Sequence, residues 1–128
     1  MSDSVVHFEV PYDDADRARG FYRDVFGWEI TPMPDIDYTI VQTGATDEQG
    51  MPTSAGYIGG GMFERSSDID RPVITINVDD MSAALDRLSA AGGKQVGETS
   101  QVADMGWAAY FHDSEGNLMG LWQSAQPG

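Results

Sequence analysis

Two side chains that can bind a ligand or exchange a proton stand two positions apart near the start of the chain, His7 and Glu9. In a β-strand, alternate side chains point to the same face. A strand over residues 5–10 would therefore place both groups on one face and three apolar residues on the other. This pattern predicts the floor of a polar pocket. The alternative interpretation is a histidine that is hydrogen-bonded within a half-exposed sheet.

A metal centre would need three or four nitrogen or oxygen ligands that converge on one point. The sequence offers one convincing ligand, His7, because His112 adjoins a predicted turn and is interpreted as solvent-exposed. The chain has no cysteine, which excludes thiolate metal sites, disulfides and a cysteine nucleophile. We therefore predict no bound cofactor, and a divalent metal with His7 among its ligands is the alternative.

Large aromatic side chains on predicted strands form a second group, Trp107, Tyr110 and Trp122. Such residues either line a ligand pocket or fill a core. We interpret them as candidate walls of an apolar cavity above the sheet, and core or dimer packing is the alternative role for each. Four methionines would complete this cavity: Met51 in the loop predicted over residues 43–54, Met62, Met105 and Met119.

Two further motifs are interpreted as structural. The segment 113–117 lacks the alternating acidic residues of a calcium loop and predicts a hairpin turn with a glycine at a positive φ angle. The glycines at 59–61 lack the lysine and the serine or threonine of a phosphate loop. They indicate close backbone packing or a bulge.

The chain repeats itself at an offset of 66 residues (73 − 7), so that residues 7–14 correspond to residues 73–80. Each copy contains a strand, an acidic helix start, an amphipathic helix, a glycine and further strands. The position that corresponds to His7 in the second copy is Val73. Two copies predict a pseudo-symmetric domain with a site where they meet.

The expected elements make two βαβββ modules in one α+β domain spanning residues 1–128, with module one at about 1–64 and module two at about 72–124. Asp13 or Asp14 would cap the first helix and Asp80 the second. The first helix would bury a stripe of Ala18, Phe21, Tyr22 and Val25. Pro11 would end the first strand, and Pro32 and Pro34 would break the second. The expected strands are 5–10, 28–30, 38–42, 55–63, 73–78, 94–96, 107–112 and 117–123.

The 128 residues carry a net charge of −14, with a pI near 4.1. Nucleic acid and anionic membranes would repel such a surface, so we expect neither as a partner. Lys94 is the only lysine beside 21 acidic residues, which favours a protein adapted to a high-salt cytoplasm. Acidity for solubility alone is the alternative. Full stability in dilute buffer, measured against molar KCl, would contradict the halophilic hypothesis.

The first 20 residues have no basic start followed by an apolar run, and no stretch approaches the length of a membrane span. We therefore expect a cytoplasmic protein.

Six stretches, in this order and spacing, resemble the glyoxalase, bleomycin-resistance and extradiol-dioxygenase superfamily, also called vicinal oxygen chelate proteins. They are residues 7–11, 21–28, 78–80, 91–93, 106–113 and 115–123. The resemblance covers nearly the whole chain and is nearest to uncharacterised glyoxalase-like members. It implies two βαβββ modules that form a cupped mixed sheet, usually in a homodimer, around a divalent metal that chelates vicinal oxygens of the substrate.

The resemblance implies metal ligands on equivalent strands, of which His7 matches the first. Val73 stands where the second copy would offer its histidine, and Gly120 stands where the last-strand glutamate would follow the turn. Among the side chains of residues 55–63, Tyr57 is the one that we consider as a ligand. The metal-free branch of the family, which binds and sequesters small molecules, needs only the cup.

These observations lead to three functional hypotheses. The first is a homodimer that binds a small organic molecule in the cup, where His7, Glu9, Tyr57 and the three aromatic residues contact the ligand. The second is a divalent-metal-dependent lyase, isomerase or dioxygenase. The third is a structural or interaction subunit whose cup is filled by its own side chains. Fold alone does not decide between them.

Overall fold

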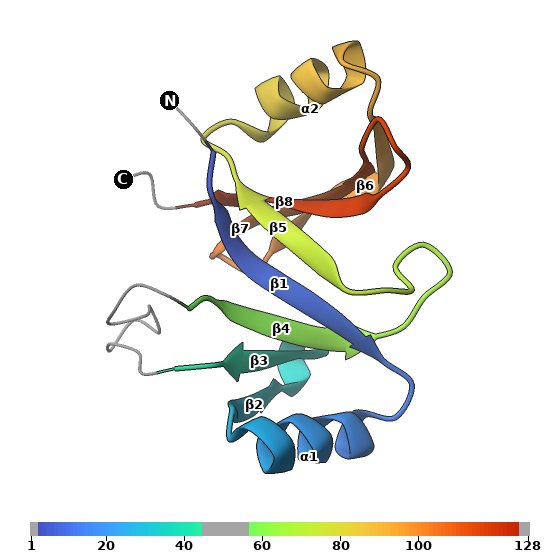
Figure 1. Cartoon of the computed structure of the whole chain (residues 1–128). Coiled ribbons are helices and arrows are strands. Elements are labelled where there is room, and N and C mark those ends of the chain that lie inside the picture. Colours follow the sequence, from blue (N-terminus) through green and yellow to red (C-terminus); the bar gives the residue numbers. More distant parts are fainter. Residues whose placement is uncertain (1–2, 45–56, 126–128) are drawn as a thin grey trace. The chain divides into compact units, whose positions relative to one another are not determined.

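The computed structural model of the chain describes residues 3–44 and 57–125, which fall into two compact units (Figure 1). The N-terminal unit comprises residues 7–72, and the C-terminal unit comprises residues 3–6 and 73–125, in both cases as far as they are described. The described residues form eight strands, two α-helices and one 3-10 helix. The predicted α+β class is confirmed. Met51 and most of the loop predicted over residues 43–54 lie outside the described residues.

The N-terminal unit contains four neighbouring strands in the order β2-β3-β4-β1, to which β1 contributes its residues 7–12. Strand β1 runs parallel to β4, and the other neighbours are antiparallel. The bounds are β1 Val5–Tyr12, α1 Ala15–Phe26, β2 Glu29–Met33, the 3-10 helix η1 Pro34–Ile36, β3 Tyr38–Gln42 and β4 Gly59–Glu64.

The C-terminal unit repeats this topology in the order β5-β8-β7-β6, again with one parallel pair, β5 and β8. The repeat predicted from the sequence is confirmed at the level of connectivity, because Glu9 pairs with Gly61 in one unit and Thr75 with Gly120 in the other. The bounds are β5 Val73–Asn77, α2 Met81–Ala90, β6 Lys94–Val102, β7 Gly106–His112 and β8 Leu118–Ser124.

Both helices begin at the aspartates that the sequence suggested. The Asp14 carboxylate accepts a hydrogen bond from the Arg17 backbone N–H, and the Asp80 carboxylate accepts one from that of Ala83, each at 3.0 Å. These bonds satisfy N–H groups that have no partner within the helix. Helix α1 ends at Gly27, which adopts the left-handed conformation (φ 71°).

Each unit buries its own apolar cluster between its helix and its sheet. In the N-terminal unit this cluster has a buried centre of Tyr12, Ile30, Val41 and Met62, against which Ala15, Ala18 and Tyr22 of α1 pack. In the C-terminal unit the buried centre consists of Val78, Met81, Ala84, Ala109, Phe111 and Leu121.

Several expectations about boundaries were wrong. Pro11 does not end β1, because the strand continues to Tyr12 and Pro11 pairs with Phe63. Pro32 lies inside β2, which tolerates it because β2 is the outer strand of its unit. Strand β6 extends to Val102 and absorbs a register irregularity between Val96 and Ser100.

The stripe expected to face the sheet from α1 is only half correct. Ala18 and Tyr22 pack against the cluster of the N-terminal unit, but Phe21 and Val25 are exposed by 54% and 56%. Exposed apolar residues on a helix are ordinary when scattered, but these lie one turn apart on one side.

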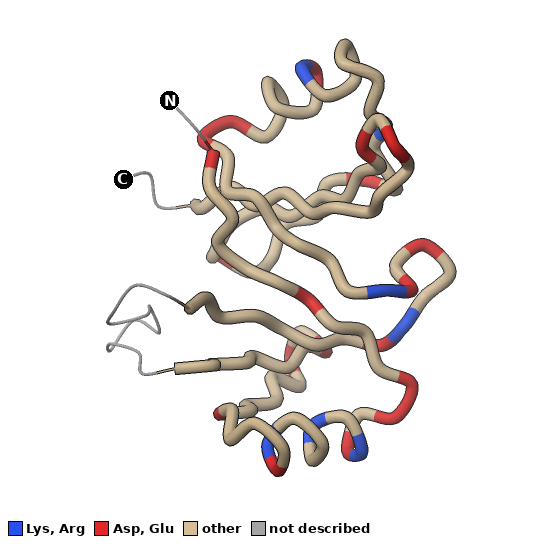
Figure 2. Tube along the Cα trace, in the orientation of Figure 1, with Lys and Arg blue, Asp and Glu red and all other residues tan. Residues whose placement is uncertain are grey.

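Acidic positions occur throughout both units, and α1 carries both basic and acidic positions (Figure 2). No helix among the described residues has the length and hydropathy needed to cross a bilayer.

Candidate functional site

Strand β1 separates its polar and apolar side chains as the sequence predicted. Phe8 and Val10 pack into the cluster beneath α1, so the strand alternation turns His7 and Glu9 to the opposite face of the sheet. His7 is half-buried and Glu9 is buried, with 8% of its surface exposed.

A third residue, Tyr38 at the start of β3, joins these two groups. Its hydroxyl donates a hydrogen bond of 2.7 Å to Glu9 Oε2 and lies 2.9 Å from His7 Nε2. Since the single phenolic proton is given to Glu9, the His7 nitrogen must be the donor in the second bond. The chain of bonds therefore runs from His7 Nε2–H through Tyr38 to the Glu9 carboxylate, and Nδ1 is left as the acceptor of a neutral ring.

Tyr38 reaches Glu9 because β4, which lies between β1 and β3, has no side chain at the critical position. Gly61 pairs with Glu9 on one side and with Ile40 on the other. A Cβ atom at Gly61 would overlap the Tyr38 hydroxyl and ring. The neighbouring Gly60 similarly makes room for the Phe8 ring, on the other face. The expected close packing is confirmed at Gly60 and Gly61, whereas a Cβ atom at Gly59 would meet only the Val41 carbonyl oxygen, at 3.3 Å.

The environment keeps the imidazole neutral. Burial lowers the pKa of His7 below its ordinary value of 6.5, and the nearby Glu9 carboxylate opposes this shift. None of the described residues hydrogen-bonds Nδ1. A neutral ring with an available Nδ1 can accept a hydrogen bond or a proton from a bound molecule.

The lowered pKa predicts a pH dependence of stability. The unfolded chain binds a proton to His7 at a higher pH than the folded protein does, so unfolding takes up a proton and stability falls as the pH drops below about 6.5. His7→Gln, which keeps an N–H donor, should reduce this loss between about pH 7.5 and pH 5.5 in urea unfolding curves. His112→Gln, at the exposed histidine, is the control and should keep the full dependence.

Two aspartates do not disturb this measurement. The pKa of Asp70 is lowered by its hydrogen bond from Arg71, and that of Asp113 is lowered by the backbone N–H groups of Asn117 and Glu115. Their stabilising contribution is lost only as the pH falls below about 3.8, outside the window of His7. If the stability of His7→Gln depended on pH in the same way as that of the wild type does, His7 would not be the source of the loss of stability below about pH 6.5.

The equivalent position in the C-terminal unit is apolar. Val73 replaces His7 and is buried, with 1% of its surface exposed, and Thr75 replaces Glu9. Gly120 occupies the place of Gly61, and a Cβ atom there would lie 2.9 Å from the Thr75 hydroxyl. The fold therefore forms in this copy without a polar pair.

The predicted aromatic residues do not share one face of their sheet. Trp107 packs against the cluster beneath α2, together with Ala109 and Phe111 of the same strand. Alternation in β7 turns Tyr110 to the opposite face. Trp122 also lies on that face, because its ring would contact a Cβ atom at Gly106, at 2.7 Å.

The predicted ligand-binding residues divide between the two units. His7, Glu9 and Tyr57 belong to the N-terminal unit, where the structure brings His7 and Glu9 together through Tyr38. Tyr57 precedes β4 and is half-buried, with its ring against Gly44. The three aromatic residues belong to the C-terminal unit, and a pocket shared by all six stays a prediction.

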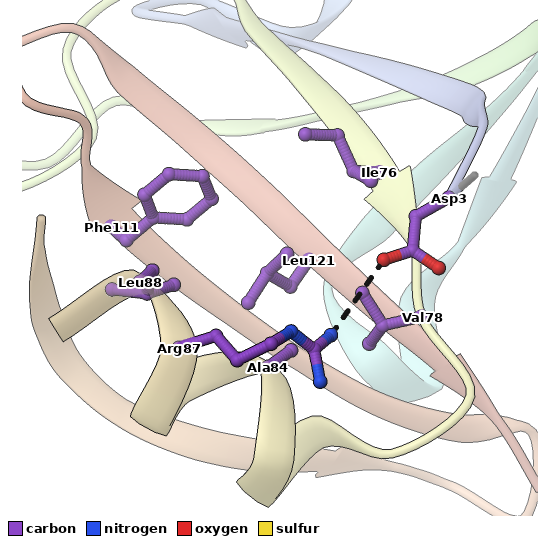
Figure 3. Close-up of a pocket in the computed structure, with 8 residues that line it drawn as sticks. All are labelled: Asp3, Ile76, Val78, Ala84, Arg87, Leu88, Phe111 and Leu121. Carbon is purple, nitrogen blue, oxygen red and sulfur yellow. Dashed lines mark ion pairs between the residues drawn. The ribbon is translucent and has the colours of Figure 1, made fainter. Parts of the chain in front are cut away.

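An open pocket of about 280 Å³ lies within the C-terminal unit, between α2 and the sheet (Figure 3). At its edge Arg87 Nη2 lies 3.8 Å from Asp3 Oδ2 in an exposed ion pair. None of the predicted ligand-binding residues lines this pocket. Its lining is Asp3, Ile76, Val78, Ala84, Arg87, Leu88, Phe111 and Leu121.

Comparison with known proteins identifies the family. Residues 4–44 match the family model described as "Bleomycin resistance protein-like N-terminal". A "Glyoxylase-like domain-containing protein" from Didymella fabae is 31% identical over 117 residues, covering 85% of this chain and 84% of the relative. The chain belongs to the glyoxalase/bleomycin resistance/dioxygenase superfamily.

Solved structures share this superfamily's fold with the chain. A hypothetical protein from Bacillus halodurans C-125 has a TM-score of 0.65 at 13% identity, covering 100% of this chain and 99% of that chain. Methylmalonyl-CoA epimerase from Mycobacterium tuberculosis has a TM-score of 0.60 at 21% identity, with coverages of 95% and 88%. A superfamily member from Vibrio splendidus 12B01 has a TM-score of 0.57 at 16% identity, with coverages of 96% and 99%.

Members of this superfamily often use a divalent metal, but the donor set among the described residues of this member does not fit one. Within residues 3–44 and 57–125, no three histidine, cysteine, aspartate or glutamate side chains group together as metal ligands. Strand β1 offers one histidine and one glutamate, and the equivalent β5 and β8 positions hold Val73 and Gly120, which have no ligand atom in their side chains.

Sequence reasoning missed Tyr38, the residue that organises the site. A signal was present in the sequence, because three consecutive glycines in a strand indicate that a neighbouring group approaches closely. What the sequence lacked was the register that sets Tyr38 across Gly61 from Glu9.

Proposed function

We propose that this superfamily member binds a small organic molecule through His7, on the sheet face of the N-terminal unit that is turned away from α1. The observation that carries the proposal is the His7–Tyr38–Glu9 chain, which fixes a neutral imidazole with its Nδ1 available. An acceptor of this kind selects a ligand with a hydrogen-bond donor, such as a hydroxyl or an amide N–H.

The internal repeat supports a functional role for the hydrogen-bonded group of His7, Tyr38 and Glu9. Burying a polar group costs free energy unless it is hydrogen-bonded, and the second copy avoids the cost with a buried valine at the equivalent position. Because the same topology forms with Val73, the fold itself does not require a histidine on this strand. A ligand contact explains why a histidine and a glutamate stand on β1.

The repeat also supplies the test variant, His7→Val, which installs the residue that the second copy uses. Wild type, His7→Val and the control His112→Val would be screened by protein-observed NMR against alcohols, hydroxy acids, amides and acyl-CoA thioesters. We include methylmalonyl-CoA because an epimerase that shares the fold has been solved with it.

A ligand bound by the wild type should bind His7→Val at least about tenfold more weakly, which corresponds to one lost hydrogen bond of about 1.4 kcal/mol. It should bind His112→Val normally. Equal affinity for wild type and His7→Val, with a clear loss of stability in the variant, would show that His7 is structural. If the protein converted a bound thioester into a product, the proposed function would be catalysis rather than binding alone.

A further inference from the structure

The outer side of α1 carries apolar side chains that its own chain covers only in part. Phe21 and Val25 are exposed by 54% and 56%, although the helix already packs Ala18 and Tyr22 against its sheet. Phe26 is exposed by 56%, with one side of its ring stacked on Trp28. Contiguous apolar surface of this kind on a strongly acidic protein indicates a contact with another molecule.

Gly20 lies beside this apolar surface, in the middle of the helix. Glycine in a helix interior lowers helix stability relative to alanine, and a Cβ atom at Gly20 would meet nothing within 4 Å. The packing of the chain itself therefore gives no reason for a glycine here. The notch that it leaves next to the protruding Phe21 ring is a reason if another helix approaches.

The charge pattern on this side of α1 is complementary to the same pattern on a second, antiparallel copy of the helix. Arg17 and Asp24 stand seven residues apart and so lie on the same side of the helix, with Gly20 and Phe21 midway between them. Both are exposed, and neither forms an ion pair with any described residue. Arg19, by contrast, is engaged with Thr39 and Asp16.

These features identify the occupant. An antiparallel copy of the same helix, related by a twofold axis, would meet Arg17 with an aspartate and Phe21 with a glycine. Two chains with a net charge of −14 repel each other, so a contact between them needs locally balanced charge. Helix α1 has it, because three arginines stand beside Asp16 and Asp24 (Figure 2).

We propose that two copies of this protein associate through antiparallel α1 helices, about a twofold axis that passes between Gly20 and Phe21. Phe21 inserts into the notch over the partner's Gly20, and Arg17 pairs with the partner's Asp24. The interface is isologous, so each of these contacts occurs twice. The proposed interface involves α1 and does not cover the opposite face of the sheet, which carries His7.

Sedimentation equilibrium between about 1 and 500 µM protein, at about 0.15 M salt, tests the interface. The wild type should show a monomer–dimer equilibrium. Gly20→Gln fills the notch with a good helix former, so it should weaken the dimer at least about tenfold while the helix remains as stable as before. A weakened dimer caused by misfolding would instead come with a loss of stability.

Charge reversal gives the decisive comparison. Arg17→Glu and Asp24→Arg should each weaken the dimer at least about tenfold, and the double variant should return to within about threefold of the wild type. Arg23→Glu, the same charge change on another side of α1, is the control and should stay within about threefold of the wild type. A wild type that is monomeric throughout, or a double variant that does not recover, would overturn the proposal.

Discussion

Replacing Gly61 by alanine is expected to destabilise the protein by about 2–4 kcal/mol, a large effect for one methyl group. The added Cβ atom would overlap the Tyr38 hydroxyl and ring. Tyr38 would have to leave its position, and the buried Glu9 carboxylate would then lose the hydrogen bond that Tyr38 donates. Urea unfolding measured by far-UV circular dichroism gives the free-energy difference.

Gly59→Ala is the matched control, because it lies in the same strand and its Cβ atom would meet nothing closer than the Val41 carbonyl oxygen, at 3.3 Å. We expect a smaller cost there, below about 1.5 kcal/mol. Combining Gly61→Ala with Tyr38→Ala should cost less than the sum of the two single changes, because the collision disappears with the ring. Equal stabilities for the Gly61→Ala and Gly59→Ala variants would show that Tyr38 moves aside freely.

Replacing Tyr38 by phenylalanine should cost about 1–3 kcal/mol while leaving the ring in place. The change removes the hydroxyl that donates to Glu9 at 2.7 Å and accepts from His7 at 2.9 Å. A buried carboxylate that loses a hydrogen-bond donor is destabilised, because water replaces the lost hydrogen bond only in part.

Tyr22→Phe is the control for this experiment. The Tyr22 ring stacks on Trp28 at a centroid distance of 5.2 Å, and its hydroxyl has no hydrogen-bond partner among the described residues. Its loss should change the free energy of unfolding by less than about 0.5 kcal/mol. Similar losses for the two variants would mean that the hydroxyl of Tyr38 contributes nothing specific.

Much of the fold could be predicted because its signals are local. The caps at Asp14 and Asp80 depend on a few neighbouring residues, and the strand at residues 38–42 alternates clearly enough to be delimited without error. Prolines were misread for a non-local reason. Pro11 and Pro32 are tolerated or not according to which side of their strand is paired, and the sequence does not show that.

The site was predicted in part for the same reason. Alternation along one strand sufficed to place His7 and Glu9 on a common face. Tyr38 stands 31 residues from His7, and its role follows from the register across β4. Trp107 could have been separated from Tyr110 in advance, because residues three apart in a strand point to opposite faces.

The proline inside β2 has a consequence for the behaviour of the protein at high concentration. Because Pro32 has no N–H to donate, it fits a paired strand where that N–H would point away from β3. The outer edge of β2 therefore lacks one of the N–H donors with which a strand of another molecule could pair. This interruption disfavours growth of the sheet from molecule to molecule, and with it amyloid-like aggregation from this edge.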